Sequence, residues 1–337
     1  MPQRLLLQGK RVRGRSAAKR IVCHSRAGSF QAHPVARRGV RIRDGRTSCS
    51  ASTSKLTYVG SMNRRAFLAA SLFLACHRAS TNARVPRIVS LSPSTTEALF
   101  AIGAGPLVVG RSRFCTYPQE ATVLPTVGGY SDPSFEVILT LAPTLVVGTR
   151  GPGGRAISDR LQARGIATYF PETESIKAIE GMLFELGNRT GHSTEAAGRV
   201  DAIETKLLAL QNRLEKVPRV RVLLLFEFEP IVSAAPDTFA HEMLERAHCT
   251  NVLTQGTGYP TLGLEQLHVL DPDAIVNATF REGGKVRAID VHHEGWASLR
   301  AIRNRRIYNL TDDTVLRPGP RVAEGAERLA STIFGEV

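Results

Sequence analysis

The sequence predicts an α/β protein made of two similar lobes, each a parallel sheet covered by helices, with one long helix between them. Three observations lead to this fold class. After Pro86, short apolar runs alternate with helical patterns, which is typical of parallel sheets with helices on their faces. An amphipathic stretch at about 193–217 separates two halves that both show this alternation. Finally, residues 129–147 are repeated as residues 258–276.

The composition is that of a folded protein whose positive charge is confined to one end. The length of 337 residues allows about two domains, and 42% apolar residues are enough to bury a core. Of the net charge of +14, residues 1–61 supply most, with 14 Lys or Arg and one acid, Asp44. Residues 62–337 are left with +1, so the body lacks the charge expected of a nucleic-acid-binding domain.

The basic stretch 1–61 has two interpretations. It is rich in Arg, Ser, Gly and Ala and shows no sustained apolar period. One interpretation is a basic arm or transit-like peptide. The other, which we expect, is a disordered or untranslated extension, with Met62 as the true start.

An export signal is predicted over residues 62–76. Asn63–Arg65 form a short cationic segment, and the largely apolar ten-residue stretch 66–75 that follows is too short to span a bilayer. Phe73-Leu74-Ala75-Cys76 resembles a bacterial lipobox, in which the Cys becomes the lipidated first residue. We expect an exported lipoprotein anchored through Cys76. A twin-arginine signal, or an ordinary cleaved signal with an incidental Cys, remains as an alternative.

The N-terminal lobe is expected over residues 85–175. Ser94-Thr95-Thr96-Glu97 has the form of a capping box that starts a helix ending at Gly103. Further helices are predicted near 133–142 and 154–164. The predicted strands are the short apolar runs 87–91, 107–110, 145–148 and 167–170.

A helical linker over 176–217 precedes a C-terminal lobe over 218–337. Within the linker, apolar residues recur every three or four positions from Val200 to Val217, which predicts a long helix that Pro218 stops. In the second lobe the predicted strands are 220–226, 274–277 and 307–310. The predicted helices are 238–247, 262–270, 295–303 and 320–334.

The internal repeat singles out two tyrosines and two glutamates. Each copy contains Gly-Tyr, a five-residue gap and Glu, then a helix, Pro and a strand, which places Tyr130 with Tyr259 and Glu136 with Glu265. Asp132 and Thr261 are the expected helix N-caps. The tyrosines either line a cleft between the lobes or pack within their own lobes. The glutamates either only stabilise the helix N-termini through the helix dipole, or they dock on arginines of a two-fold partner.

Two cysteines, Cys115 and Cys249, lie in the body of the chain, and no Cys or His spacing of a metal site is present. They could form a disulfide in an oxidising compartment, or remain as two buried thiols. The sequence leaves both possibilities open.

Five segments together resemble a known family. They are RIVSLSPSTTEALFAIGA (87–104), FCTYPQEA (114–121), LPTVGGYSDPSFEVILTLAPTLVV (124–147), YPTLGLEQLHVLDPDAIV (259–276) and RPGPRVAEGAERLA (317–330). The chain is similar to the periplasmic substrate-binding proteins that deliver vitamin B12, haem or iron-siderophores to ABC importers, and most of all to the cobalamin-binding component. The resemblance covers about residues 85–335.

This resemblance implies a class III periplasmic-binding-protein fold, in which two Rossmann-like lobes with central parallel sheets are joined by one long backbone helix and close little on binding. It implies a monomer without intrinsic cofactor that catalyses no reaction, carries a metal-chelate and meets a permease dimer. Cobalamin is the first choice of ligand, followed by haem and ferric siderophore.

Particular residues receive roles from the same resemblance. Glu136 and Glu265 would dock on the permease. The residues implied in ligand binding are Phe114, Tyr117, Tyr130, Arg150, Tyr259 and Arg317. Tyr130 would be an iron ligand only if the cargo is haem. An α/β enzyme or a metallochaperone is the alternative of a different class, and it requires converging catalytic or metal-ligating groups.

Overall fold

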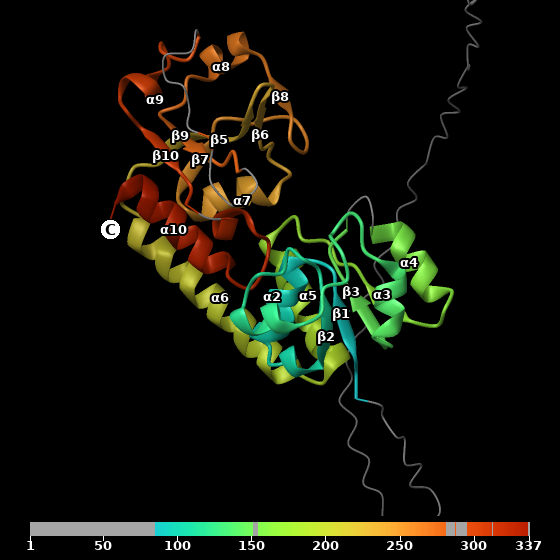
Figure 1. Cartoon of the computed structure of the whole chain (residues 1–337). Helices are drawn as coiled ribbons and strands as arrows, with labels where there is room; N and C mark the ends of the chain where they lie inside the picture. Colours follow the sequence, from blue (N-terminus) through green and yellow to red (C-terminus); the bar gives the residue numbers. More distant parts are fainter. Residues whose placement is uncertain (1–84, 151–153, 281–286, 288–294, 312, 336–337) are drawn as a thin grey trace, which may run out of the picture. The chain divides into compact units, whose positions relative to one another are not determined.

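Two β-sheets flanked by helices make up the part of the chain that the computed structural model describes, which is residues 85–150, 154–280, 287, 295–311 and 313–335 (Figure 1). All of these residues belong to one unit, Ser80–Val337. The predicted fold class is confirmed. The extension 1–61 and the export signal 62–76 lie outside the described residues.

The first sheet is wholly parallel among the described residues. Its strand order is β2–β1–β3–β4. The strands are Ile88–Ser90 (β1), Val108–Arg111 (β2), Leu145–Val147 (β3) and Ala167–Tyr169 (β4). The central strands β1 and β3 are buried throughout, because helices cover both of their faces.

Two of the three α-helices of this lobe begin at other residues than the sequence predicts, and the third begins at the predicted residue 154. They are Pro93–Ala101 (α2), Phe135–Thr140 (α3) and Gly154–Gln162 (α4), with 3₁₀ turns at Gly105–Leu107 (η1) and Gln119–Val123 (η2). The predicted capping box of α2 is wrong. Pro93 occupies the first turn, where its missing N–H costs nothing, so the cap moves back to Ser92, whose side chain accepts from the Thr95 N–H.

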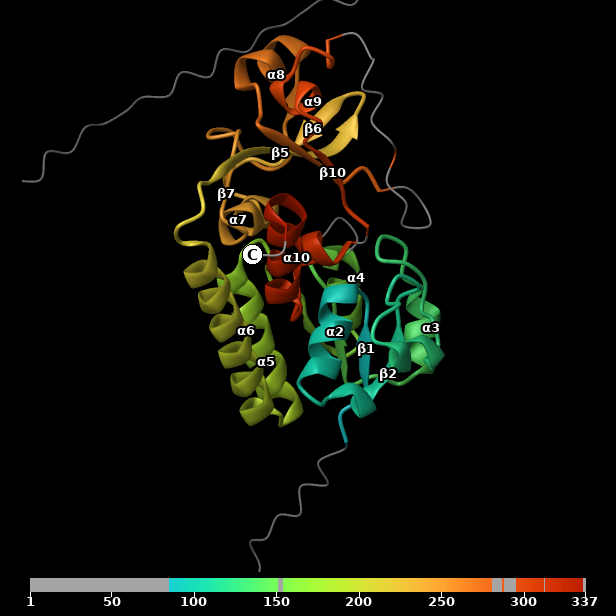
Figure 2. The ribbon, with the colours of Figure 1, turned by 90° about the vertical axis from the view of Figure 1, so that its left-hand side faces the viewer.

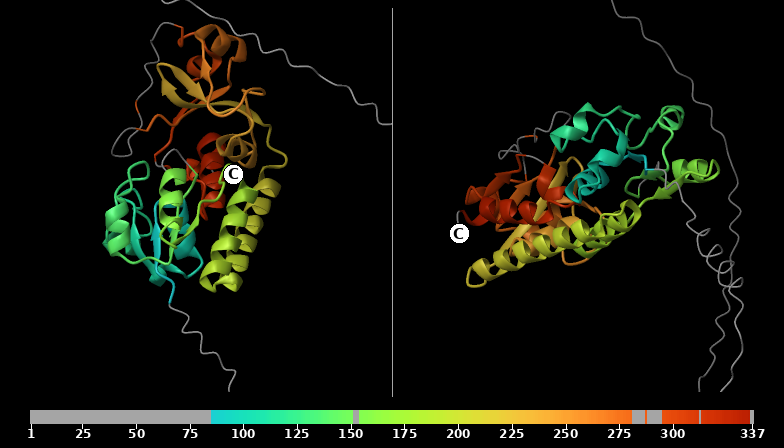
Figure 3. Two further views of the ribbon diagram at one scale, coloured as in Figure 1. Left: turned by 90° about the vertical axis from the view of Figure 1, so that its right-hand side faces the viewer. Right: turned by 90° about the horizontal axis from the view of Figure 1, so that it is seen from below.

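A pair of antiparallel helices follows the first sheet. Ile176–Thr190 (α5) ends at Gly191, whose left-handed conformation at φ 77° turns the chain into Ser193–Leu214 (α6). The 22 residues of α6 span about 33 Å. Its buried stripe contains the predicted apolar residues Val200, Ile203, Leu207, Leu210 and Leu214. α5 and α6 lie side by side (Figures 2 and 3).

The second sheet is mixed rather than parallel throughout. Its order is β10–β9–β5–β6–β8, with β7 also paired to β5. The strands are Val220–Phe228 (β5), Ile231–Ser233 (β6), Cys249–Asn251 (β7), Thr261–Leu262 (β8), Ala274–Asn277 (β9) and Ile307–Asn309 (β10). β6 is antiparallel to both β5 and β8, so the parallel plan predicted for this half is wrong along that edge.

The helices of the second lobe are Phe239–Arg246 (α7), Leu264–Leu270 (α8), Arg300–Arg303 (α9) and Val322–Phe334 (α10), with a 3₁₀ turn at Asp313–Leu316 (η3). The predicted helix 295–303 shortens to α9. Gly295 has φ 90°, outside the helical region, and Trp296 is buried edge-on against Phe228.

One apolar core extends from one sheet to the other. Ile88 of β1 and Val222 of β5 face the same cluster of buried side chains, which also contains the buried stripe of α6 and residues of α2, α5, α7 and α10. The opposite faces have separate cores, in which Val89 packs toward α3 and α4, and Leu223 toward α8 and α9. Packed side chains therefore join the two lobes, in addition to the connecting helices.

Candidate functional site

The carboxyl ends of the parallel strands in the first sheet share one edge. The chain leaves β2 into a loop that carries Phe114 and Tyr117, and it leaves β3 into Thr149 and Arg150. Phe170 directly follows β4. Ligands of open α/β sheets bind at this edge. Three of the sequence-predicted residues thus come from loops at the expected edge.

Tyr130 and Arg150 are in contact, 20 positions apart in the chain. The phenol O–H of Tyr130 donates to the Arg150 carbonyl at 3.0 Å. The guanidinium of Arg150 pairs with Glu172 and donates to the Phe170 carbonyl. Beside it lies a cavity of about 500 Å³, lined by Arg150, Gly154, Arg155, Ser158 and Phe170. The structure therefore brings two predicted site residues together next to a cavity at the strand ends.

The aromatic loop after β2 offers two half-exposed rings. Phe114 is 50% exposed and Tyr117 46% exposed. The Arg113 guanidinium lies 5.0 Å from the centroid of the Phe114 ring, and that of Arg321 lies 4.0 Å from the centroid of Tyr117. Each ring is therefore supported by a cation–π contact while much of its apolar surface stays open.

Tyr259 is the corresponding tyrosine of the second lobe. It is 50% exposed, and its ring packs edge-on against Phe226 with a centroid distance of 5.1 Å. Desolvation raises the pKa of its phenol to about 12, and the charges of Glu174 and Asp237 contribute in the same direction. Tyr259 therefore remains a protonated phenol at neutral pH.

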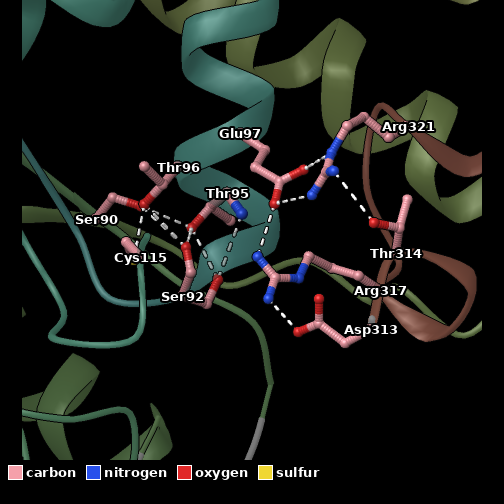
Figure 4. Close-up of polar contacts among 10 residues, drawn as sticks. All are labelled: Ser90, Ser92, Thr95, Thr96, Glu97, Cys115, Asp313, Thr314, Arg317 and Arg321. Carbon is pink, nitrogen blue, oxygen red and sulfur yellow. Dashed lines mark hydrogen bonds and ion pairs between the residues drawn. The ribbon is translucent and has the colours of Figure 1, made fainter. Parts of the chain in front are cut away.

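Arg317 is already paired with two carboxylates. Its guanidinium donates to the Glu97 carboxylate at 2.8 Å, pairs with Asp313, and is only 14% exposed (Figure 4). Burial lowers the pKa of Arg317, but hydrogen bonds and charges from Asp313 and Glu97 outweigh burial and raise it above its ordinary value. Any ligand contact of Arg317 would compete with these two carboxylates.

Glu97 itself is a residue that the sequence analysis assigned to a helix cap. Its side chain is 1% exposed and also accepts from Arg321, at 2.8 Å from Nε and 2.9 Å from the second nitrogen. The hydrogen bonding that Arg321 donates to the Glu97 carboxylate is the main cause that raises the pKa of Arg321. Glu97 belongs to α2 and the arginines to the segment around the start of α10, so this cluster links the two lobes.

Glu136 and Glu265 both lie exposed in the first turns of α3 and α8, as a docking role requires. The predicted N-caps are wrong. Ser134 caps α3, with its side chain accepting from the Val137 N–H, and Gly263 precedes α8. Asp132 instead pairs with Arg113 through both carboxylate oxygens, and Thr261 lies in β8.

Cys115 and Cys249 are both free and buried, so the disulfide alternative is wrong. Desolvation raises the pKa of the Cys249 thiol to about 12 and that of Cys115 above its usual value. Within the described ranges, no group of three or more His, Cys, Asp or Glu is arranged to hold a metal ion. None of the helices described there is long and apolar enough to cross a membrane.

Comparison with known proteins gives a consistent result. A family model for periplasmic binding proteins matches residues 88–314. The uncharacterized ABC transporter substrate-binding lipoprotein YvrC of Bacillus subtilis is 30% identical over 255 residues, which cover 74% of this chain and 80% of the relative. The vitamin B12-binding protein of Photorhabdus laumondii is 26% identical, with coverage of 78% and 93%.

The fold of this chain is also similar to that of a solved structure. The apo form of the periplasmic heme-binding protein RhuT from Roseiflexus sp. RS-1 matches with a TM-score of 0.65 and 26% identity, over 74% of this chain and 98% of that chain. The match to this family, together with the two α/β lobes, defines the chain as a carrier of small molecules. The chain belongs to the periplasmic binding protein family, in the group that serves ABC importers of vitamin B12, haem and iron chelates. It is an exported substrate-binding protein and not an enzyme.

Proposed function

We propose that this substrate-binding protein captures cobalamin and delivers it to a permease dimer. The observation that carries the proposal is the state of the two repeat tyrosines. The Tyr130 phenol donates a hydrogen bond to the Arg150 carbonyl, and the half-exposed ring of Tyr259 packs edge-on against Phe226. Both rings are thus oriented by neighbouring groups, which suits packing against a flat ligand, whereas ligation of a ferric ion by Tyr130 would require this hydrogen bond to be given up.

Aromatic area supports the same choice. Phe114, Tyr117 and Tyr259 each leave about half of the residue's surface exposed. Rings of this kind provide flat apolar area at low entropic cost, as a corrin macrocycle needs. The 26% identity to a vitamin B12-binding protein over most of both chains points in the same direction. Arg150, beside its cavity, would meet a phosphate or amide edge of the ligand.

Haem is the second candidate, favoured by the likeness to a heme-binding structure. Tyr130 would then have to release the Arg150 carbonyl and lose its proton to become an axial ligand. Arg150 and Arg317 would meet the propionates, at the expense of their pairs with Glu172, Glu97 and Asp313. A ferric siderophore, which also presents anionic oxygens, is ranked third.

Two further roles belong to the proposal. Glu136 and Glu265 dock on permease arginines, one from each lobe, because both carboxylates are exposed at equivalent places in the repeat. Cys76 carries a lipid anchor, in keeping with the lipoprotein name of the 30% identical relative.

An absorbance titration with hydroxocobalamin and, separately, with haemin tests the ligand. We expect saturable 1:1 binding of cobalamin that survives Tyr130→Phe with a loss of about tenfold or less, since one hydrogen bond is removed. Tyr308→Phe is the control, because the Tyr308 phenol also donates to a backbone carbonyl, that of Ile333. A shift of the haemin Soret band that is lost in Tyr130→Phe would show that the ligand is haem rather than cobalamin. Binding of neither would refute both.

A further inference from the structure

We propose that Glu97 is a positioning residue of the ligand site. Through Arg321 and Arg317 it fixes the ring of Tyr117 and the second lobe in place before a ligand arrives. The part of this inference that concerns ligand affinity rests on the proposed function, because it assigns Tyr117 to the ligand.

The carboxylate of Glu97 is shared by two arginines of the other lobe. Arg317 donates to one oxygen at 2.8 Å, and the Nε of Arg321 donates to the other oxygen at the same distance (Figure 4). The two arginines are four positions apart, 220 and 224 residues along the chain from Glu97. Each is less than one fifth exposed, and Glu97 is 1% exposed. Displacement of either lobe would therefore separate buried opposite charges.

The guanidinium of Arg321 contacts the Glu97 carboxylate and the Tyr117 ring at the same time. While its nitrogens donate to Glu97 and to Thr314, its plane lies over the Tyr117 ring at 4.0 Å. A guanidinium that is held by a bidentate carboxylate cannot rotate freely, so Tyr117 packs on a fixed surface. If Glu97 is lost, Arg321 is released, and the support of Tyr117 is released with it.

The loop of Tyr117 is also held by the neighbouring residues of α2. The Oγ1 of Thr96 lies 3.0 Å from the Sγ of Cys115 and 2.8 Å from the Oγ of Ser90. Thr95 lies 2.8 Å from Ser90 and from Ser92 (Figure 4). Consecutive buried polar residues of one helix thus hold the aromatic loop on one side and the second lobe on the other.

Stability alone does not account for this arrangement. Buried ion pairs are often no more stabilising than apolar side chains of similar volume, because both partners lose their hydration. What such a pair provides is a defined geometry, and here that geometry includes a half-exposed ring at the candidate site. The placement favours positioning over simple core packing.

The first test needs no ligand. Spin labels are placed at Thr140→Cys in α3 and Val269→Cys in α8, both exposed sites, in the full chain with Cys23, Cys49 and Cys76 replaced by Ser. Pulsed dipolar spectroscopy should give a narrow distance distribution that Glu97→Gln broadens. Arg300→Gln is the matched control, since Arg300 also pairs with two acids, Asp271 and Asp273, within one lobe. It should leave the distribution narrow.

The second test measures binding of hydroxocobalamin, and of haemin in parallel. If Glu97→Gln leaves about a tenth of the molecules competent, the apparent Kd rises about tenfold. Should that variant fail to fold, Arg321→Lys keeps a positive charge beside Glu97 but removes the flat group over Tyr117, and it should also weaken binding. Wild-type distances and wild-type Kd in these variants would overturn the proposal. If the wild type binds neither probe, the proposed function fails, while the distance test still decides the role of Glu97.

Discussion

A close approach between α5 and α6 makes Gly187 the most sharply constrained glycine of the helix pair. A Cβ at Gly187 would lie 2.6 Å from the Cβ of Ala196, 2.9 Å from the His192 carbonyl oxygen and 3.2 Å from the Cα of Ser193. Two of these atoms belong to the backbone, so they cannot move aside by a rotamer change. Overpacking of this kind costs about 1–3 kcal/mol, and the upper part of that range applies here.

Gly187→Ala also gains the helix propensity of Ala, about 1 kcal/mol. The net loss should be about 2 kcal/mol of unfolding free energy. At about 2–4 °C per kcal/mol for a domain of this size, the melting temperature followed by circular dichroism should fall by roughly 4–8 °C. Because α5 and α6 both contribute to the core that joins the lobes, binding should weaken as well.

Gly181 in the same helix is the matched control. A Cβ there meets nothing within 4 Å, and the residue is exposed. Gly181→Ala should therefore gain about 1 kcal/mol from propensity alone and raise the melting temperature by roughly 2–4 °C. Opposite signs at two glycines of one helix isolate the packing effect. If Gly187→Ala is as stable as Gly181→Ala, the close approach of the two helices is refuted.

Three further predictions concern charge and thiols. A hydrogen bond from the backbone N–H of Arg300, and the charge of Arg300, lower the pKa of Asp271 below its ordinary value of 3.8, so Asp271 adds stability above that pH. Asp271→Asn should therefore reduce the unfolding free energy at pH 7 by about 1 kcal/mol or less, which is seen as a lower melting temperature. This difference should vanish as the pH falls below the pKa of Asp271 in the folded protein. Equal deficits at pH 7 and pH 2 would contradict this. Cys115 and Cys249 should resist alkylation at pH 8 until the protein is unfolded, as read by peptide mass spectrometry, and prompt labelling would show them accessible. Glu136→Arg combined with Glu265→Arg should abolish uptake in vesicles that contain the permease while the Kd stays within about twofold, and undiminished uptake would exclude these docking residues.

The sequence predicts the central strands well because their environment is simple. β1, β3 and β9 are covered on both faces, so every residue is buried and most of them are apolar. β6, β7 and β8 show no periodicity of their own. β6 and β7 form by pairing with β5, and β8 forms by pairing with β6. A tertiary context of this kind leaves no local pattern to detect.

The candidate site shows the same difference between local and tertiary signals. The repeat singles out Tyr130, Tyr259, Glu136 and Glu265 as candidates because the pattern is encoded locally twice. Glu97 was missed because Ser94-Thr95-Thr96-Glu97 satisfies a local rule, while the partners that decide its role lie more than 200 residues away. Pro93 was the available signal. A proline in the first turn places the cap at Ser92, which moves Glu97 too deep into the helix to serve a capping box.

A site that is assembled before the ligand arrives has a direct consequence for binding. The apolar core shared by both sheets and the Glu97 cluster both resist relative motion of the lobes. Association then costs little additional ordering, because rings such as Tyr117 are already held by their neighbours. Affinity in such a carrier depends on how well the fixed aromatic surfaces match the ligand. Substitutions at the exposed rings should therefore alter which ligand is preferred, whereas substitutions at Glu97 should weaken all ligands alike.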